Sequence, residues 1–225
     1  MPLIEKSDQF LYRIIRFERL VQMLQTDRWH FAHPSAWEDP YETHITNSLS
    51  NTMFAQCWCR KGVSDAMWRI YSHDKLGVRI RTTEKKLIVA LGEATKKQDM
   101  GFRTAKVKYL NPLEYLVHAR RIRDELKTKA TFVRASAQLF FKRTAFSHEA
   151  ETRVVVFDPT QPADADVGGI SIELNTRQLI DSVLVDPRAP EEFVAAYKHY
   201  LQEHLKFLGS VKKSQLYRSG VTREV

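Results

Sequence analysis

The sequence predicts an α+β protein with mixed, mostly antiparallel sheets flanked by helices. Short apolar or alternating segments, which are typical of strands, outnumber strand–helix–strand repeats, and the elements follow one another irregularly. A long amphipathic segment near 112–142 predicts a helical insertion, either one helix or two with a bend near Lys129. No repeat, low-complexity tract or linker divides the 225 residues, so we expect a single domain over 1–225.

The first half of the chain alternates between strand and helix signals. Apolar alternation or a continuous apolar run predicts strands at 10–15, 28–33, 52–59, 76–82 and 103–110. Apolar residues three and four positions apart predict helices at 17–26, 64–72 and 83–94. Ser64 and Asp65 support the start of the second helix, because both residue types cap helix N-termini well.

The second half begins with the long helical segment, whose first turn suits Pro112. Strands are expected at 151–157, 169–174, 182–186 and 210–217, and a last helix at 190–208. The turn-rich run from Asp158 to Gly169 indicates a surface loop between two strands.

The chain is basic, with a net charge of +8 and a pI of about 9.5. The positive charge gathers at 79–86, 96–108, 118–143 and 206–223. Solvated helix faces explain any one of these clusters. Together they modestly favour an anionic partner such as a nucleotide or a nucleic acid.

Several features predict a cytoplasmic protein without a membrane partner. No apolar run approaches the ~20 residues of a spanning helix, and the N-terminus MPLIEKSDQF lacks the apolar stretch of a signal peptide. Cys57 and Cys59 are too close in sequence to bridge easily, so reduced thiols in a reducing compartment are expected.

The loop HPSAWEDPYE at 33–42 is the first candidate site. Trp37 and Tyr41 bracket Asp39 and Glu42 between two prolines, and rigidly held loops often carry function. In the structural alternative, Trp37 fills the core and Asp39 caps a short helix. That alternative accounts less well for Glu42.

The segment 64–80 is the second candidate site. A helix over 64–72 would place Trp68 and Tyr71 near its end and deliver Ser72 and His73 to the mouth of a strand. Aromatic residues at helical spacing serve equally often as core.

Charged residues on two predicted strands form the third and fourth candidates. Alternation along 146–157 would put Glu149, Glu151 and Arg153 on one face, where two carboxylates repel unless an arginine offsets them. An exposed Glu–Arg pair is the structural alternative. Arg13 interrupts an apolar strand, so its guanidinium must reach a partner, a ligand anion or solvent.

A metal site is not expected. The eight histidines are scattered, and His30 and His33 would point to opposite faces. The sequence also contains neither a Walker loop nor a GxGxxG motif.

Read in order, the motifs resemble one bacterial and phage family, domain of unknown function 2971. They are LYRI, FAHPSAWEDPYE, QCWCRKGVSDAMWRIYSHDKLGVRI, HEAETRVVV and LIDSVLVDP, and they cover roughly residues 10 to 190. Glu38 replaces the usual asparagine of the loop, and Phe146 is the aromatic residue before the E-x-E element. The family name itself implies no function.

More distantly, the arrangement is similar to the ADP-ribosyltransferase fold. That resemblance implies NAD as substrate and a protein or nucleic-acid acceptor, an activity of the kind used in phage–host conflict. It also implies that Arg13 contacts the dinucleotide, that Tyr71 or Ser72 shapes the nicotinamide pocket, that Glu151 is the key carboxylate and that Glu149 positions the acceptor. The predicted catalytic residues are Glu149, Glu151 and Arg13. The predicted nucleotide-binding residues are Arg13, Trp37, Asp39, Glu42, Trp68, Tyr71, Ser72, His73 and Arg153.

Two other functions stay open. A regulatory module could keep the nucleotide- or partner-binding cleft without the reaction. A metal-dependent nuclease is suggested by Asp39 with Glu151-x-Arg153, although Arg153 stands where the corresponding motif has lysine.

Overall fold

The structure is a computed structural model that describes residues 9–161 and 168–218. Residues 162–167, which are half of the predicted loop at 158–169, therefore lie outside the described residues. Within the described residues, no helix is both long enough and apolar enough to cross a membrane.

The main sheet is built mostly from antiparallel pairs, in the order β11-β10-β4-β1-β3-β2-β9, with β8 pairing both β3 and β5. Its strands are β1 (Phe10–Ile15), β2 (Arg28–Ala32), β3 (Met53–Cys59), β4 (Val78–Thr83), β5 (Gly101–Lys106), β8 (Glu151–Phe157), β9 (Gly169–Glu173), β10 (Ser182–Val185) and β11 (Ser210–Lys213). The pair β10–β11 is parallel, as is a small separate pair of β6 (Lys108–Leu110) and β7 (Phe141–Arg143). The predicted α+β class with mostly antiparallel sheets is confirmed.

The sheet divides at β3. One edge of β3 pairs with β8 along its whole length, from Met53↔Phe157 to Cys59↔Glu151. The other edge is shared, because β1 pairs with it at Tyr12↔Cys59 and β2 at Ala32↔Ala55. Between these two points β1 and β2 diverge, so the middle of β3 borders a split in the sheet.

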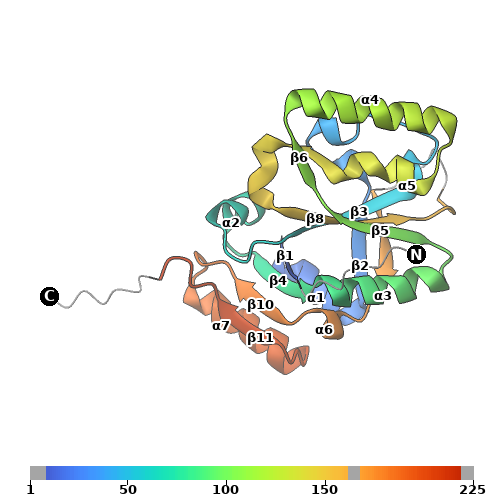
Figure 1. Cartoon of the computed structure of the whole chain (residues 1–225). Helices are drawn as coiled ribbons and strands as arrows, with labels where there is room; N and C mark the ends of the chain where they lie inside the picture. The colour runs from blue at the N-terminus through green and yellow to red at the C-terminus, as the bar shows by residue number, and fades with distance from the viewer. Residues whose placement is uncertain (1–8, 162–167, 219–225) are drawn as a thin grey trace.

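Helices cover the two faces of this sheet unequally. The helices are α1 (Phe17–Thr26), α2 (Asp65–Tyr71), α3 (Glu84–Lys97), α4 (Pro112–Thr128), α5 (Phe132–Ala135), α6 (Thr176–Leu179) and α7 (Glu191–His199). Figure 1 shows α4 and α5 on the opposite side of the sheet from α1, α3, α6 and α7. Buried residues of α1 and α3 join Phe54, Trp58 and Val156 in the main core. A smaller core lies under α5 and includes Ala55 and Val155.

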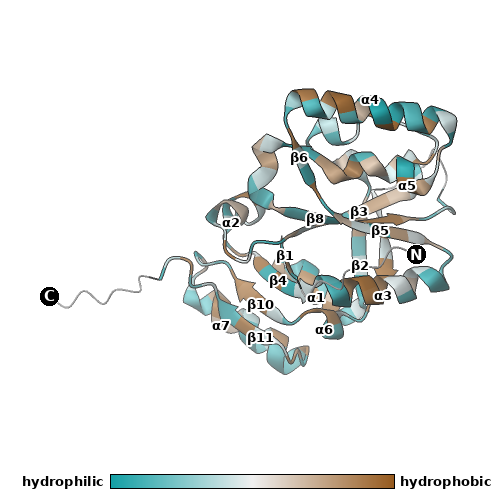
Figure 2. Ribbon diagram, viewed as in Figure 1, coloured by the Kyte–Doolittle hydropathy of each residue, from teal (hydrophilic) through white to brown (hydrophobic). Residues whose placement is uncertain are grey.

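The long helical segment is two helices rather than one. Asn111 and Glu114 form a capping box at the start of α4, and the helix ends at Thr128. Lys129 is extended, which places the break where the bend was predicted. Figure 2 shows apolar and polar residues side by side along α4, which packs a narrow buried stripe of Tyr115, Ala119 and Ile122 against the body.

The predicted helix over 112–142 is wrong at its end. After α5 and a 3-10 helix at Ser136–Phe140, the chain becomes the strand β7. The apolar spacing continues through Phe140, so periodicity alone extended the helix too far. The predicted strand at 103–110 likewise divides into β5 and β6 at Val107.

Candidate active site

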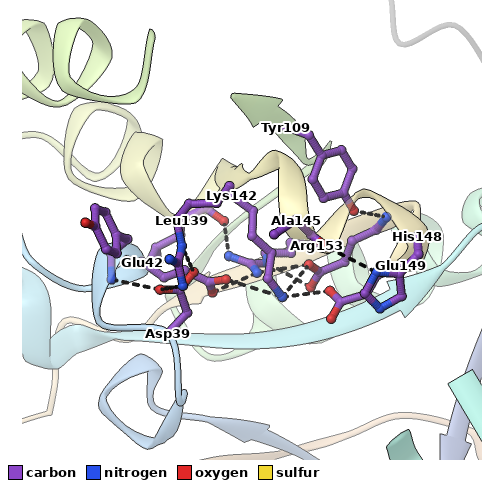
Figure 3. Close-up of polar contacts among 12 residues, drawn as sticks. Asp39, Glu42, Tyr109, Leu139, Lys142, Ala145, His148, Glu149 and Arg153 are labelled. Carbon is purple, nitrogen blue, oxygen red and sulfur yellow. Dashed lines mark hydrogen bonds and ion pairs between the residues drawn. The ribbon is translucent and has the colours of Figure 1, made fainter. Parts of the chain in front are cut away.

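A buried lysine stands at the centre of the candidate site. Lys142 lies on β7, and its Nζ is 2.7 Å from Glu149 Oε2, 3.3 Å from Glu42 Oε1 and 3.8 Å from Glu151 Oε2. Its ammonium also lies over the ring of Phe146, 4.6 Å from the centroid. Figure 3 shows Lys142, Glu42 and Glu149 converging from separate parts of the chain. Lys142 therefore ties the loop after β2 to the start of β8.

A second buried cation lies beside it. Arg153 Nε and Nη2 donate to the two oxygens of Glu151 at 2.8 and 2.9 Å, and Nη2 also donates to Glu42 Oε2 at 2.8 Å. Nη1 donates to the carbonyl oxygen of Leu139 at 2.8 Å, and the guanidinium lies 4.2 Å from the ring of Trp37. Arg153 is 1% exposed, so these contacts replace its water shell.

The turn before β8 places the two glutamates. Glu149 ends a 3-10 helix at Thr144–Glu149, and Ala150 has a left-handed backbone with φ of 45°. Alternation along a strand, which was the basis for putting Glu149 and Glu151 on one face, is therefore wrong for Glu149. The turn nevertheless brings both carboxylates to Lys142. Tyr109 holds the turn, because its hydroxyl accepts a 2.7 Å bond from the Glu151 backbone N–H.

The loop at 33–42 combines both roles considered for it. Asp39 caps the short helix Pro40–Glu42 by accepting from the Tyr41 N–H at 3.2 Å, as the structural alternative held. The same carboxylate accepts from Arg143 at 3.0 and 3.2 Å. Glu42 is 2% exposed and reaches the buried cations.

The electrostatics of the cluster differ from one carboxyl to the next. Burial raises the pKa of Glu42 despite Arg153 and Lys142 nearby, and its Oε1 is in ion-pair contact with the Lys142 ammonium at 3.3 Å. For Glu151, burial acts in the same direction, but Arg153 and Lys142 outweigh it and lower the pKa. Glu151 is thus held as an anion, while Glu42 is the carboxyl that more readily keeps a proton.

Arg13 lies at the split in the sheet. Strand alternation directs it to the face of Leu11, yet β1 leaves β3 just beyond Tyr12. Burial lowers the pKa of Arg13, and Cys57 and Tyr71 partly offset this effect. No ion pair or hydrogen bond of its guanidinium is found within 9–161 and 168–218.

Cys57 and Tyr71 also lie close to the carboxylates. Burial and the neighbouring Glu151 raise the pKa of the Cys57 thiol, which makes it a poor nucleophile. Burial raises the pKa of Tyr71 as well, and Glu149, Cys57 and Glu151 add to the effect. Cys57 and Tyr71 thus interact electrostatically with both the guanidinium and the carboxylates, although strand alternation puts Arg13 on the face of Leu11 and Glu151 on the opposite face, with Cys59 and Tyr12.

The other predicted residues on segment 64–80 have mixed placements. Trp68 is 1% exposed, and the Ser72 hydroxyl accepts from the Gly77 N–H at 3.0 Å. Burial of Trp68 in the core and the Ser72–Gly77 hydrogen bond give both residues a structural role. Tyr71 is 45% exposed, and His73 is exposed in the turn after α2.

Sequence reasoning missed Lys142, Arg143, Tyr109 and Cys57 as parts of this site. Lys142 and Arg143 lay inside a stretch assigned to a helix, where a basic residue off the apolar stripe is expected to face solvent. An unbroken Phe-Phe-Lys-Arg run just before the E-x-E element was the available signal. Among the described residues, no group of three or more His, Cys, Asp or Glu side chains is placed to hold a metal ion.

The lowered pKa of Glu151 predicts how stability depends on pH. Its contribution is fully present above the ordinary glutamate pKa of 4.5 and is lost as the pH falls through the lower folded value. The unfolding free-energy difference between wild type and Glu151→Gln, measured in urea from about pH 7 to about pH 3, should shrink on acidification. If this free-energy difference stays constant over that pH range, the pKa of Glu151 is not lowered in the folded protein. Glu173→Gln, at an exposed position on β9, is the control.

The fold and site thus define an α+β protein with a buried ion-pair cluster beside a split sheet. The model of a family described as "Protein of unknown function (DUF2971)" matches residues 67–154, and this is the family that the sequence motifs resemble. The matched stretch runs from α2 into β8 and includes Lys142, Glu149, Glu151 and Arg153. No curated protein matches the chain.

Solved structures similar to this chain include three of DarT from Thermus sp. 2.9, in complex with NAD+, with carba-NAD+ and with ADP-ribosylated ssDNA. Each has 11% sequence identity to this chain and a TM-score of 0.43. The alignments cover 94%, 93% and 93% of this chain and 98%, 97% and 95% of the DarT chains, respectively.

Proposed function

We propose that this chain is a nucleotide-handling enzyme that transfers ADP-ribose from NAD to a protein or nucleic-acid acceptor. The observation that carries the proposal is the half-buried guanidinium of Arg13, which has no ion pair or hydrogen bond within the described residues and is influenced electrostatically by Cys57 and Tyr71, as these are by Glu151. A cation that has lost part of its hydration without gaining an acidic partner favours the binding of an anion. The diphosphate of a dinucleotide supplies such an anion.

The neighbouring carboxylates suit the chemistry of that substrate. In the reaction, the bond between ribose C1 and the nicotinamide nitrogen breaks, and its electron pair leaves with nicotinamide. The ribose develops oxocarbenium character, as in glycoside cleavage, and a fixed anion such as Glu151 stabilises it. The acceptor oxygen or nitrogen then bonds to C1 and releases its proton, for which Glu149 is the candidate base.

An arginine variant tests the nucleotide site directly. Arg13→Ala should weaken NAD binding by about 10- to 100-fold, because the variant cannot make a charge-assisted hydrogen bond to a phosphate. Isothermal titration calorimetry measures this change. Arg28→Ala is the matched control, since Arg28 is an exposed arginine on strand β2, and the NAD affinity of this variant should stay at the wild-type value.

Incubating the wild-type protein with labelled NAD and cell lysate decides between the functions. Transfer of label or release of nicotinamide supports the enzyme. NAD binding without either product would instead identify a non-catalytic binding module. Absence of binding, hydrolysis and transfer together would overturn the proposal.

The nuclease alternative has less support from the geometry. The Asp39 carboxylate, which the nuclease would need for its metal ion, is occupied by Arg143 and the Tyr41 N–H. Magnesium-dependent nicking of DNA that disappears in Asp39→Ala would nonetheless favour it over ADP-ribose transfer.

A further inference from the structure

Four residues on β1 and β4 form a surface that the proposed chemistry does not use. Phe10 and Tyr12 of β1 alternate with Leu11, while Arg79 and Arg81 of β4 alternate with Ile80. The intervening residues Leu11 and Ile80 are buried in the main core. Phe10, Tyr12, Arg79 and Arg81, here called the β1–β4 platform, therefore point to the face opposite α1 and α3.

The platform pairs each aromatic ring with a guanidinium. Arg79 lies over Tyr12 and Arg81 over Phe10, each 4.6 Å from the ring centroid. The two rings are 6.4 Å apart, and Phe10 is 41% exposed. Flat aromatic and guanidinium groups thus lie next to one another, with Phe10 exposed and Tyr12, Arg79 and Arg81 half-buried.

The two arginines have no acidic partner within the described part of the chain. Neither side chain forms an ion pair or a hydrogen bond there, and the Nε of each is buried without a hydrogen-bond partner. Burial lowers the pKa of Arg79, the neighbouring Arg81 lowers it further, and Tyr12 and Cys59 act in the opposite direction. Two adjacent cations held without a carboxylate create a place for anionic groups.

The platform is continuous with the candidate active site. Register pairs Glu151 with Cys59, Cys59 with Tyr12, and Tyr12 with Arg81. Directly paired residues project from the same face of a sheet, so this row leads from the site carboxylate onto the platform.

We infer that the β1–β4 platform binds single-stranded nucleic acid. Phosphates would meet Arg79 and Arg81, and unpaired bases would stack on Phe10, on Tyr12 and on the guanidinium planes. A single strand fits better than a duplex, because stacking on a strand face requires bases freed from their partners. The binding itself does not depend on NAD. Only the idea that the bound strand is the acceptor rests on the proposed function.

Fluorescence anisotropy without NAD tests this inference, using a labelled single strand of about 15 nucleotides at about 0.15 M salt. Phe10→Leu with Tyr12→Leu should weaken binding by ~5-fold or more, because stacking is removed while apolar volume is retained. Arg79→Ala with Arg81→Ala should weaken binding and lower the slope of log affinity against log salt by about 0.7 for each phosphate that the variant no longer neutralises.

The controls separate this surface from general attraction to polyanions. Arg120→Ala with Arg123→Ala removes two exposed arginines of α4 and should leave binding within twofold of wild type. Unlabelled duplex or poly-glutamate should compete poorly. Absence of wild-type binding, equal competition by duplex or poly-glutamate, or an equal loss in the α4 variant would each overturn the inference. Circular dichroism verifies that each variant is folded. If the double arginine variant does not fold, the Phe10→Leu, Tyr12→Leu variant still tests the platform on its own.

Discussion

Replacing Arg153 with methionine should lower the free energy of unfolding by about 3–5 kcal/mol. The substitution leaves Glu151 and Glu42 buried without the guanidinium that binds both, and it also removes the bond to the Leu139 carbonyl. Methionine fills part of the space, so the loss reports mainly the uncompensated charges. Urea or thermal unfolding of the purified variant measures it.

The matched control is Arg121→Met, at an exposed arginine of α4 that pairs with Glu125 four residues later. Exposed pairs of this kind contribute about 0.3–0.5 kcal/mol, so this variant should unfold almost as the wild type does. A loss at Arg153 no larger than the loss at Arg121 would mean that water reaches the cluster and screens its charges.

Glu151→Gln should reduce nicotinamide release from NAD by about 10²–10³-fold, which is the usual effect of removing one group that stabilises a charged transition state. Glutamine keeps the size of the side chain and an acceptor for Arg153 but removes the fixed negative charge. NAD affinity should change much less than the rate, since Arg13 is the residue proposed to hold the phosphates. Initial rates at saturating NAD, together with calorimetric binding, measure the two effects separately.

Glu173→Gln again serves as the control for the rate, because this exposed carboxylate of β9 is outside the site. A Glu151→Gln variant that retains wild-type turnover would show that another group stabilises the reacting ribose. The proposed reaction would then need a different carboxylate, and Glu149 would be the next to test.

Local patterns were sufficient to predict most of the fold. The strands β1, β3 and β8 and the helices α1 and α2 lie within one or two residues of their predicted ranges, because each has a clear period and a clear stop signal. The pairing of these strands was not predictable in the same way. Register depends on contacts between segments as far apart in sequence as Arg28 and Glu173, and no local pattern encodes the sharing of one β3 edge by β1 and β2.

The candidate site shows the same limit. Glu42 stood out because it follows two aromatic residues in a loop held by two prolines, and Glu151 and Arg153 because they lie at the start of an apolar strand. The structure brings these three into contact. Lys142 did not stand out, since a lysine at the end of a predicted helix is ordinarily solvated. Its burial follows from the change to a strand at Phe141, which only the tertiary contacts of β7 with β6 reveal.

The shared edge of β3 also affects how the molecule can move. β1 is held to β4 by six consecutive register pairs, but it meets β3 at Tyr12↔Cys59 alone. β2 meets β3 at Ala32↔Ala55 in the same way. A change in the angle between β1, which carries Arg13, and β2, which carries His30, would therefore break fewer ladder bonds than a change in the continuous β3–β8 ladder, which carries the carboxylates.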